Sequence, residues 1–180
     1  GTEGRLTTLY RPAADEFVGD MDLHFDADRL LFSMRDATGR WQIFEVGLEA
    51  GRPVARRGEP RQVSRGDEPD VDNYDACYLP DGRIIFCSSA CFQGVPCNFS
   101  DVAVLYRMDA DGGNVRQLCF EQDHDFNPAV LDNGRVLYLR WDYTDTPHVW
   151  NRILFSMNPG LVRSTGSRGS RNCLPEPRRP

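Results

Sequence analysis

The sequence predicts an all-β protein: a β-propeller fragment made of four-stranded antiparallel blades, with almost no helix. A strand, a tight turn and a second apolar strand recur three times, each time with an arginine just after the turn, at Arg29, Arg83 and Arg135. These arginines are 54 and 52 residues apart, and four short strands recurring at about 40–50 residues are typical of propeller blades. No stretch shows a sustained apolar period of about 3.6 residues, which would indicate a helix. A β-sandwich is the alternative, but a sandwich does not require the same turn and strand at matched offsets.

The middle repeat is the most complete of the three. Its turn at Pro80-Asp81-Gly82 joins two apolar runs, and the predicted strands of this repeat are 76–79, 83–88, 102–109 and 115–120. The first repeat predicts strands at 23–25, 30–34 and 41–46 and a weaker edge segment ending near Val63. The third predicts strands at 128–131, 135–139 and 153–158 and stops before a fourth.

These strands divide the chain into segments. We expect a lead-in strand within residues 1–17, blades at about 18–66, 67–121 and 122–160, and a tail at 161–180. The tail is rich in Arg, Gly, Ser and Pro and lacks apolar periodicity, so it is predicted to be disordered or aberrant. About two and a half to three blades are therefore expected.

Several motifs carry a family resemblance. The runs Tyr78–Phe86 (YLPDGRIIF) and Leu105–Leu118 (LYRMDADGGNVRQL) resemble the TolB-type, WD40-like (PD40) repeat. Three further runs, 72–83, 90–97 and 139–148, resemble bacterial proteins that share the middle domain of the hydrazine synthase alpha subunit. The resemblance covers about residues 5–159. It implies a propeller that closes with about six or seven blades within a larger exported multidomain protein. It brings no haem chemistry, because the sequence has no Cys-x-x-Cys-His motif.

Composition restricts the partners. The formal net charge is −6, which argues against nucleic acid because phosphate binding needs a basic surface. No window approaches the roughly 18 apolar residues of a membrane span. The chain contains no lysine.

Cysteine spacing suggests one disulfide. Cys91 and Cys97 bracket the short loop Phe-Gln-Gly-Val-Pro, which a disulfide would pin. Such a bond favours a periplasmic or otherwise extracytoplasmic location. The alternative is two half-buried thiols in a cytosolic protein.

Functional groups concentrate on one predicted face. In a propeller, the loop that leads into each first strand shares a face with the loop between the second and third strands. The lead-in loops carry Asp20, Asp22, Asp123 and Asn127 among other acidic residues. From this face we select a candidate ligand- or partner-binding set: Asp72, Tyr74, Asp75, Gln93, His124, Asp125, Trp141, Asp142, Tyr143, Asp145 and His148.

Each chemical interpretation has a plainer alternative. Asp123–Asp125 with Asp142, Asp145 and His148 could ligate a metal, although acidic residues in such loops commonly cap backbone amides. Trp141, Tyr143 and Trp150 could stack on a ligand or pack on their own blade. The run from Asp109 to Asn114 resembles a calcium loop but lacks the glutamate at position twelve, which favours a turn. We therefore predict no metal and no cofactor.

Catalysis has little support. Ser88 and Ser89 lack a nucleophile elbow, and a general acid–base pair such as Asp125 and Asp142 is a minor alternative. The favoured function is a non-catalytic binding or scaffold module. Its predicted partners are other blades or domains of the parent chain, or a protein or small-molecule ligand, with self-association through open blade edges. The alternative is an enzyme, a metal-assisted hydrolase or a carbohydrate-active protein, with its site on the same face.

Overall fold

The computed structural model describes residues 4, 8–13, 16–49, 52–53, 59–95, 100–143, 152–160 and 163–165. Their strands form three antiparallel sheets, each in chain order. The first sheet contains β1 (Val18–Leu23), β2 (Arg29–Arg35), β3 (Trp41–Glu49) and β5 (Arg61–Gln62), with β4 (Arg52–Pro53) on the end of β3. The second contains β6 (Asn73–Tyr78), β7 (Ile84–Ser88), β8 (Val104–Met108) and β9 (Arg116–Gln117). The third contains β10 (Asp125–Val130), β11 (Val136–Trp141), β12 (Arg152–Asn158) and β13 (Arg163–Thr165).

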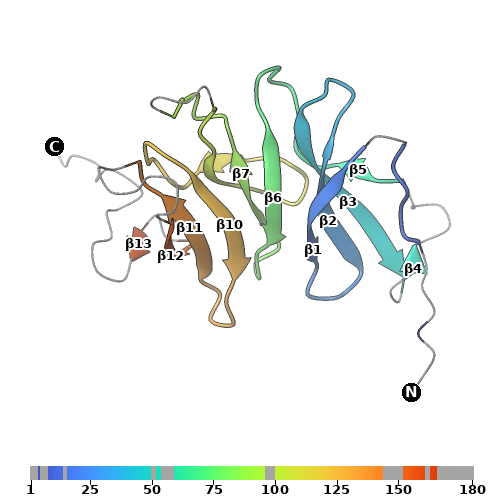
Figure 1. Cartoon of the computed structure of the whole chain (residues 1–180). Helices are drawn as coiled ribbons and strands as arrows, with labels where there is room; N and C mark the ends of the chain where they lie inside the picture. Colours follow the sequence, from blue (N-terminus) through green and yellow to red (C-terminus); the bar gives the residue numbers. More distant parts are fainter. Residues whose placement is uncertain are drawn as a thin grey trace.

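The three sheets are propeller blades. Figure 1 shows the first strands β1, β6 and β10 next to one another, and β6 contacts β1, β2 and β3 on one side and β10 on the other. The middle blade is covered on both faces, so all five residues of β7 are buried. The described residues form no helix, and hence none that could cross a membrane. The predicted fold class is confirmed.

The third blade exposes apolar residues at positions that are buried in the middle blade. Cys87 pairs with Leu105 in the second sheet, and both are fully buried under the third blade. The equivalent pair in the third sheet is Leu139 and Leu154. Leu154 is 55% exposed and Leu139 is only partly buried. The described residues therefore leave one apolar blade-packing face uncovered.

The third blade has a fourth strand, contrary to the sequence prediction. Pro159 and Gly160 form a tight turn, in which the Gly160 N–H donates to Asn158 Oδ1 at 3.0 Å. The chain then returns as β13, with Asn158 opposite Arg163. The prediction ended this blade at residue 160 because the composition changes there, although a tight turn was sufficient to continue the sheet. Residues 166–180 of the predicted tail lie outside the described residues.

Each first strand also begins earlier than predicted and contains a bulge. The register shifts once in β1, once in β6 and once in β10. At the bulge lies Asp20, Asp75 or Asn127, with φ of 50°, 53° and 53°. Asp and Asn tolerate this left-handed conformation better than other residues with a side chain. A polar residue in the left-handed region breaks the alternation by which a strand is recognised, which explains the late predicted starts.

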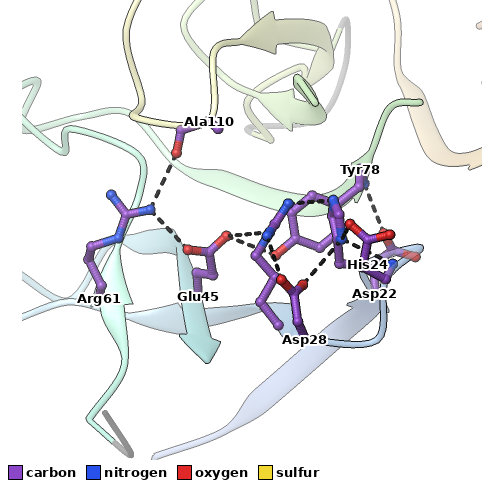
Figure 2. A network of polar contacts seen from close by, with 9 residues as sticks. Asp22, His24, Asp28, Glu45, Arg61, Tyr78 and Ala110 are labelled. Carbon is purple, nitrogen blue, oxygen red and sulfur yellow. Dashed lines mark hydrogen bonds and ion pairs between the residues drawn. The ribbon is translucent and has the colours of Figure 1, made fainter. Parts of the chain in front are cut away.

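A polar network holds the first blade against the second (Figure 2). The Tyr78 phenol donates to Glu45 at 2.9 Å, and the Tyr78 N–H donates to Asp22 at 2.8 Å. Arg61 pairs with Glu45 at 2.9 Å and also donates to the Ala110 carbonyl at 3.3 Å. Burial raises the pKa of Tyr78, and the neighbouring Glu45 charge raises it further. This network lies at the turn end of the blades and fixes their relative position.

The turn from Asp109 is a second contact between these blades. The Gly112 N–H donates to the Asp109 carbonyl at 2.9 Å, and Gly112 has a φ of 82°. A Cβ at Gly112 would lie 2.1 Å from the Val63 carbonyl oxygen of the first blade. Asn114 donates its amide to the Asp109 carboxylate at 2.5 Å. The predicted turn is confirmed, and its glycine is required by both conformation and space.

Candidate functional site

A cavity of about 350 Å³ opens where the three first strands lie next to one another. We call it the inner-strand pocket, and it is lined by Asp20, Tyr74, Asp75, His124, Phe126 and Asn127. Asp20 comes from the first blade, Tyr74 and Asp75 from the second, and the other three from the third. A cavity of this volume suits a small ligand or a single side chain.

The bulge residues line the pocket, and two of them, Asp75 and Asn127, link the second blade to the third by hydrogen bonds. The Asn127 backbone N–H donates to Asp75 Oδ2 at 2.7 Å, and the Asn127 side-chain amide donates to the same oxygen at 3.2 Å. The Asp75 N–H in turn donates to Ser33 Oγ of the first blade at 3.0 Å. Bulges commonly re-aim side chains next to functional sites, and here they do so at the same position of three repeats.

We call the contact between the first and second blades the first seam, and the contact between the second and third blades the second seam. At each seam the backbone N–H of a bulge residue, Asp75 or Asn127, donates to the preceding blade, but the acceptors differ. Ser33 and Cys87 are equivalent positions, opposite Gly19 in β1 and Tyr74 in β6. The Ser33 hydroxyl accepts the amide at the first seam, but a cysteine sulfur is a weak acceptor, and the Asp75 carboxylate does so at the second. Asp20 is consequently not needed at the first seam. Its exposed carboxylate makes no hydrogen bond or ion pair within the described part of the chain.

Burial shifts the pKa of Asp75, one of the two carboxylates that line the pocket. It raises the pKa of Asp75 from 3.8 to about 6, with the Asp20 charge adding to the increase and the Asn127 N–H opposing it. Asp75 is therefore charged at pH 7, at a free-energy cost to the folded state. Burial also raises the pKa of Tyr74, so its phenol remains a hydrogen-bond donor.

A backbone amide fixes the tautomer of His124. The Ala103 N–H donates to His124 Nδ1 at 3.1 Å, so the neutral ring carries its proton on Nε2. Burial lowers the pKa of His124, which keeps the ring neutral at pH 7. The ring lies 5.7 Å from the Trp141 ring, centroid to centroid, and edge-on to Phe126.

Four polar groups of the pocket thus have no hydrogen-bond partner among the described residues. Two are donors, the Tyr74 phenol and His124 Nε2–H, and two are acceptors, the Asp20 carboxylate and Asn127 Oδ1. Asp75 adds a second carboxylate, and none of the lining residues is an arginine. Convergent polar groups beside an aromatic ring are typical of a binding site.

A second cavity, of about 220 Å³ between the first two blades, differs in this respect. Its buried polar residues bond one another: Ser64 Oγ donates to Gln42 Oε1 at 2.6 Å, and Asn73 Nδ2 donates to the same oxygen at 3.0 Å. Such a satisfied network stabilises the seam and leaves no buried group for a ligand.

The structure brings together three of the residues selected from the sequence, Tyr74, Asp75 and His124. Asp20 and Asn127 were placed on the same predicted face but were not selected. Phe126 was missed. The signal that could have identified Asp20 and Asn127 was the polar residue repeated at the bulge of each first strand.

Other selected residues have structural roles. Asp72 accepts the Trp41 N–H at 2.9 Å and pairs with Arg40 at 3.5 Å, across the first seam. Trp141 packs on His124, and the Tyr143 ring lies edge-on to Trp141 at 5.9 Å, which supports the packing alternative for these aromatics. Gln93 is exposed in its loop and Asp142 is half-buried.

Asp125 is a correction to the predicted binding face. It is fully buried and accepts two hydrogen bonds from Arg140, at 2.8 Å from Nε and 3.2 Å from Nη2. Arg140 is also paired with Glu121 at 2.7 Å. A carboxylate in this position stabilises the core and does not reach a ligand, so the Asp125–Asp142 acid–base pair is not formed at the pocket.

The remaining selected residues, Asp145, His148 and Cys97, lie outside the described residues, as does Trp150. Cys91 Sγ lies 3.2 Å from the Val102 carbonyl oxygen and its thiol is free in the structure. With Cys97 outside the described residues, the disulfide stays a prediction.

The described residues contain one group with metal-ligand spacing, and it is not in the pocket. His24, Asp26 and Asp28 bring three ligand atoms within 4.8 Å of one another. The Arg29 guanidinium already pairs with Asp28 at 3.0 Å and contacts the His24 ring. Figure 2 shows His24 and Asp28 in the network of the first seam. These groups therefore serve the blade contact.

Comparisons with known proteins identify the architecture. No family model matches the chain, and no curated protein matches it. Among solved structures, putative TolB from Agrobacterium tumefaciens is similar with a TM-score of 0.60 and 17% identity, over 84% of this chain and 47% of that one. The fold is a TolB-type β-propeller.

Two further propeller structures extend the comparison. Puromycin hydrolase has a TM-score of 0.59 at 18% identity, over 85% of this chain and 22% of its own. Hydrazine synthase from Kuenenia stuttgartiensis has a TM-score of 0.56 at 13% identity, over 78% of this chain and 24% of its own. The propeller described here spans less than half of each of these three chains. At such identities the likeness establishes the fold, and function must be argued from the site.

Proposed function

We propose that this propeller is a non-catalytic binding module of a larger exported multidomain protein, and that it binds its ligand in the inner-strand pocket. One observation carries the proposal: three blades each contribute first-strand residues to a single cavity in which four polar groups lack protein partners. The neighbouring cavity differs, because there the buried Gln42, Ser64 and Asn73 side chains bond one another.

The pocket is better suited to binding than to catalysis. His124 Nδ1 accepts a backbone amide, so no carboxylate orients the ring as in a nucleophile-activating triad. Ser88, the serine at the end of β7, is 1% exposed and lies away from the pocket lining. The rigid first strands hold the polar groups in place, which favours recognition of a ligand of matching shape.

One observation favours the enzyme alternative. Asp75, with a pKa of about 6, lies close enough to Asp20 for the Asp20 charge to raise that pKa, and such a pair can act as acid and base. Hydrolysis of peptide or glycoside substrates by the chain, abolished in Asp75→Asn, would support this alternative over the binding module.

The extracytoplasmic location and the partnership with further blades belong to the same proposal. They are supported by the resemblance to TolB-type proteins and by the uncovered apolar face of the third blade at Leu154. Alkylation of Cys91 and Cys97 in protein recovered from the periplasm and from the cytosol would test the location, because the proposed disulfide blocks labelling only in the oxidised pool.

The binding proposal is tested by amide NMR mapping on the chain with three probes: n-butylammonium, xylobiose and Mn²⁺. We expect at least one probe to perturb the amides of Tyr74, Asp75 and Asn127 more than those of Ser64 and Gly66 in the second cavity. A response confined to the second cavity, or the absence of any response, would overturn the proposal.

A further inference from the structure

The chemistry of the inner-strand pocket selects one class of ligand. Resting on the proposed function, we propose that the pocket binds a primary ammonium group, such as a lysine side chain or a small alkylamine. These 180 residues contain no lysine, so a lysine side chain at this site comes from outside them.

The first argument is charge. Asp20 and Asp75 give the pocket two carboxylates, and none of the lining residues is an arginine. An anionic ligand would meet two like charges without a compensating cation, which is a strong form of discrimination. A bound cation would instead offset the repulsion between the two carboxylates, because a nearby positive charge favours the ionised form of a carboxylate.

The second argument is the number and origin of the acceptors. Asp75 Oδ2 accepts both N–H groups of Asn127, which leaves Asp75 Oδ1 free of hydrogen bonds within the described residues. Asp20 and Asn127 Oδ1 supply two further free acceptors. Three acceptors, one from each blade at the same position of the repeat, match the three N–H donors of an ammonium group.

The third argument is the aromatic lining. Tyr74 and Phe126 are equivalent positions in β6 and β10, opposite Cys87 and Leu139. Aromatic faces beside carboxylates contact the methylene chain of an alkylammonium ion and attract its charge. The equivalent position in β1 is Gly19, so the first blade adds no aromatic ring at this position.

A bound metal ion fits these residues less well. The pocket contains no set of three ligand atoms within 4.8 Å of one another, whereas His24, Asp26 and Asp28 form such a set elsewhere in the described chain. His124 Nδ1 is occupied by the Ala103 amide, and Nε2 carries the proton. An ammonium ion donates to oxygen acceptors alone, so Asn127 Oδ1 and the two carboxylates can serve it without a histidine ligand.

The test uses Nα-acetyl-lysine methylamide and its side-chain acetylated analogue, which has nearly the same shape without the charge. Both are titrated into the chain by amide NMR, together with Mn²⁺ and xylobiose as competitors of other classes. We expect the charged probe to perturb the pocket amides of Tyr74, Asp75 and Asn127, and acetylation to weaken binding at least about tenfold, a typical ion-pair contribution.

Matched variants locate the effect. Asp20→Asn should weaken the charged probe about tenfold and leave the acetylated probe unchanged. The variant should fold normally, because Asp20 makes no hydrogen bond within the described residues, and its amide spectrum reports this directly. Asp132→Asn removes the same charge from the exposed turn at the far end of β10 and should have no effect.

Binding should also weaken as pH falls through about 6, where Asp75 becomes protonated. The groups around Asp75 that could modify this dependence are Asp20 from β1, Tyr74 and Cys77 from β6 and Cys87 from β7. The last three carry raised pKa values, so they stay neutral between pH 5 and 8. His124 is neutral above its lowered pKa, and its protonation at lower pH would further oppose a cation.

The outcomes separate the two proposals. Equal perturbation of the pocket by both lysine probes, or a response to xylobiose or Mn²⁺ alone, would overturn the ammonium assignment and leave the binding site standing. Equal weakening by Asp20→Asn and Asp132→Asn would also overturn the assignment, because a general charge effect would then explain it. If none of the four probes perturbs the pocket amides, both the binding site and the ammonium assignment are overturned.

Discussion

Replacing Asp75 with asparagine should stabilise the protein at neutral pH. The pKa of Asp75 is raised from 3.8 to about 6 by burial, so keeping its carboxylate ionised at pH 7 costs the folded state on the order of 2–3 kcal/mol at most. Asparagine removes the charge and retains a carbonyl oxygen that can accept the Asn127 N–H. In a chain of 180 residues this corresponds to an increase in Tm of about 4–10 °C.

The sign depends on pH. Between about pH 4 and 6 the folded state binds more protons at Asp75 than the unfolded state, so this residue's contribution to stability falls as pH rises through that window. The difference between Asp75→Asn and the original protein should therefore be near zero at pH 4 and full at pH 7.5. Urea denaturation at the two pH values measures it, with Asp132→Asn as the control for loss of one exposed charge.

The opposite result would refute the reasoning. If Asp75→Asn destabilised the protein equally at both pH values, the carboxylate would be a structural acceptor for the Asn127 amide and no charge would be held at a cost. If instead the stabilisation appears only at neutral pH, Asp75 is a residue whose charge opposes folding. Natural proteins retain such residues where function requires them.

Three further perturbations test other parts of the structure. Gly112→Ala should lower the free energy of unfolding, measured in urea, by at least about 1 kcal/mol more than Gly134→Ala. Both glycines have a positive φ (82° and 76°), but only a Cβ at Gly112 would meet a backbone oxygen, at 2.1 Å; equal losses would contradict the close contact. Arg140→Leu should destabilise by about 3–5 kcal/mol in urea, because it leaves Asp125 charged and buried, and a loss below about 1 kcal/mol would show the ion pair to be dispensable. Leu154→Asp should reduce self-association in sedimentation velocity, since Leu154 is 55% exposed on an uncovered blade face; a monomeric original protein would contradict this.

The repeat made the blades predictable. A hairpin with an Asp-Gly or Asn-Gly turn places two strands at a known separation, and three matched hairpins imply three blades. The same alternation rule failed for the first halves of β1, β6 and β10, because a bulge with a polar residue at positive φ interrupts the pattern. It failed again at β13, whose three residues are too few for a periodic signal.

The face of the candidate site was predictable from topology, and the identity of its residues was only partly so. Asp75 and Asp125 look alike in sequence, as acidic residues at the start of an inner strand. Their environments differ because β10 pairs with β11 in a register that places Arg140 opposite Asp125. Asp75 lies at a bulge, where its carboxylate lines the pocket and accepts the Asn127 N–H groups. Register and bulge position are properties of paired strands, so a single-strand pattern does not contain them.

The seams explain why one of three equivalent polar residues is free to bind. At the first seam the Ser33 hydroxyl accepts the bulge amide, and at the second seam Asp75 must do so because Cys87 replaces the serine. A single change of side chain at this position of the second strand thus decides whether the bulge residue of that blade is structural or available. Leu139 is the equivalent residue of the third blade and has no acceptor at all. A further blade packed on it would have to find another acceptor for its own bulge amide.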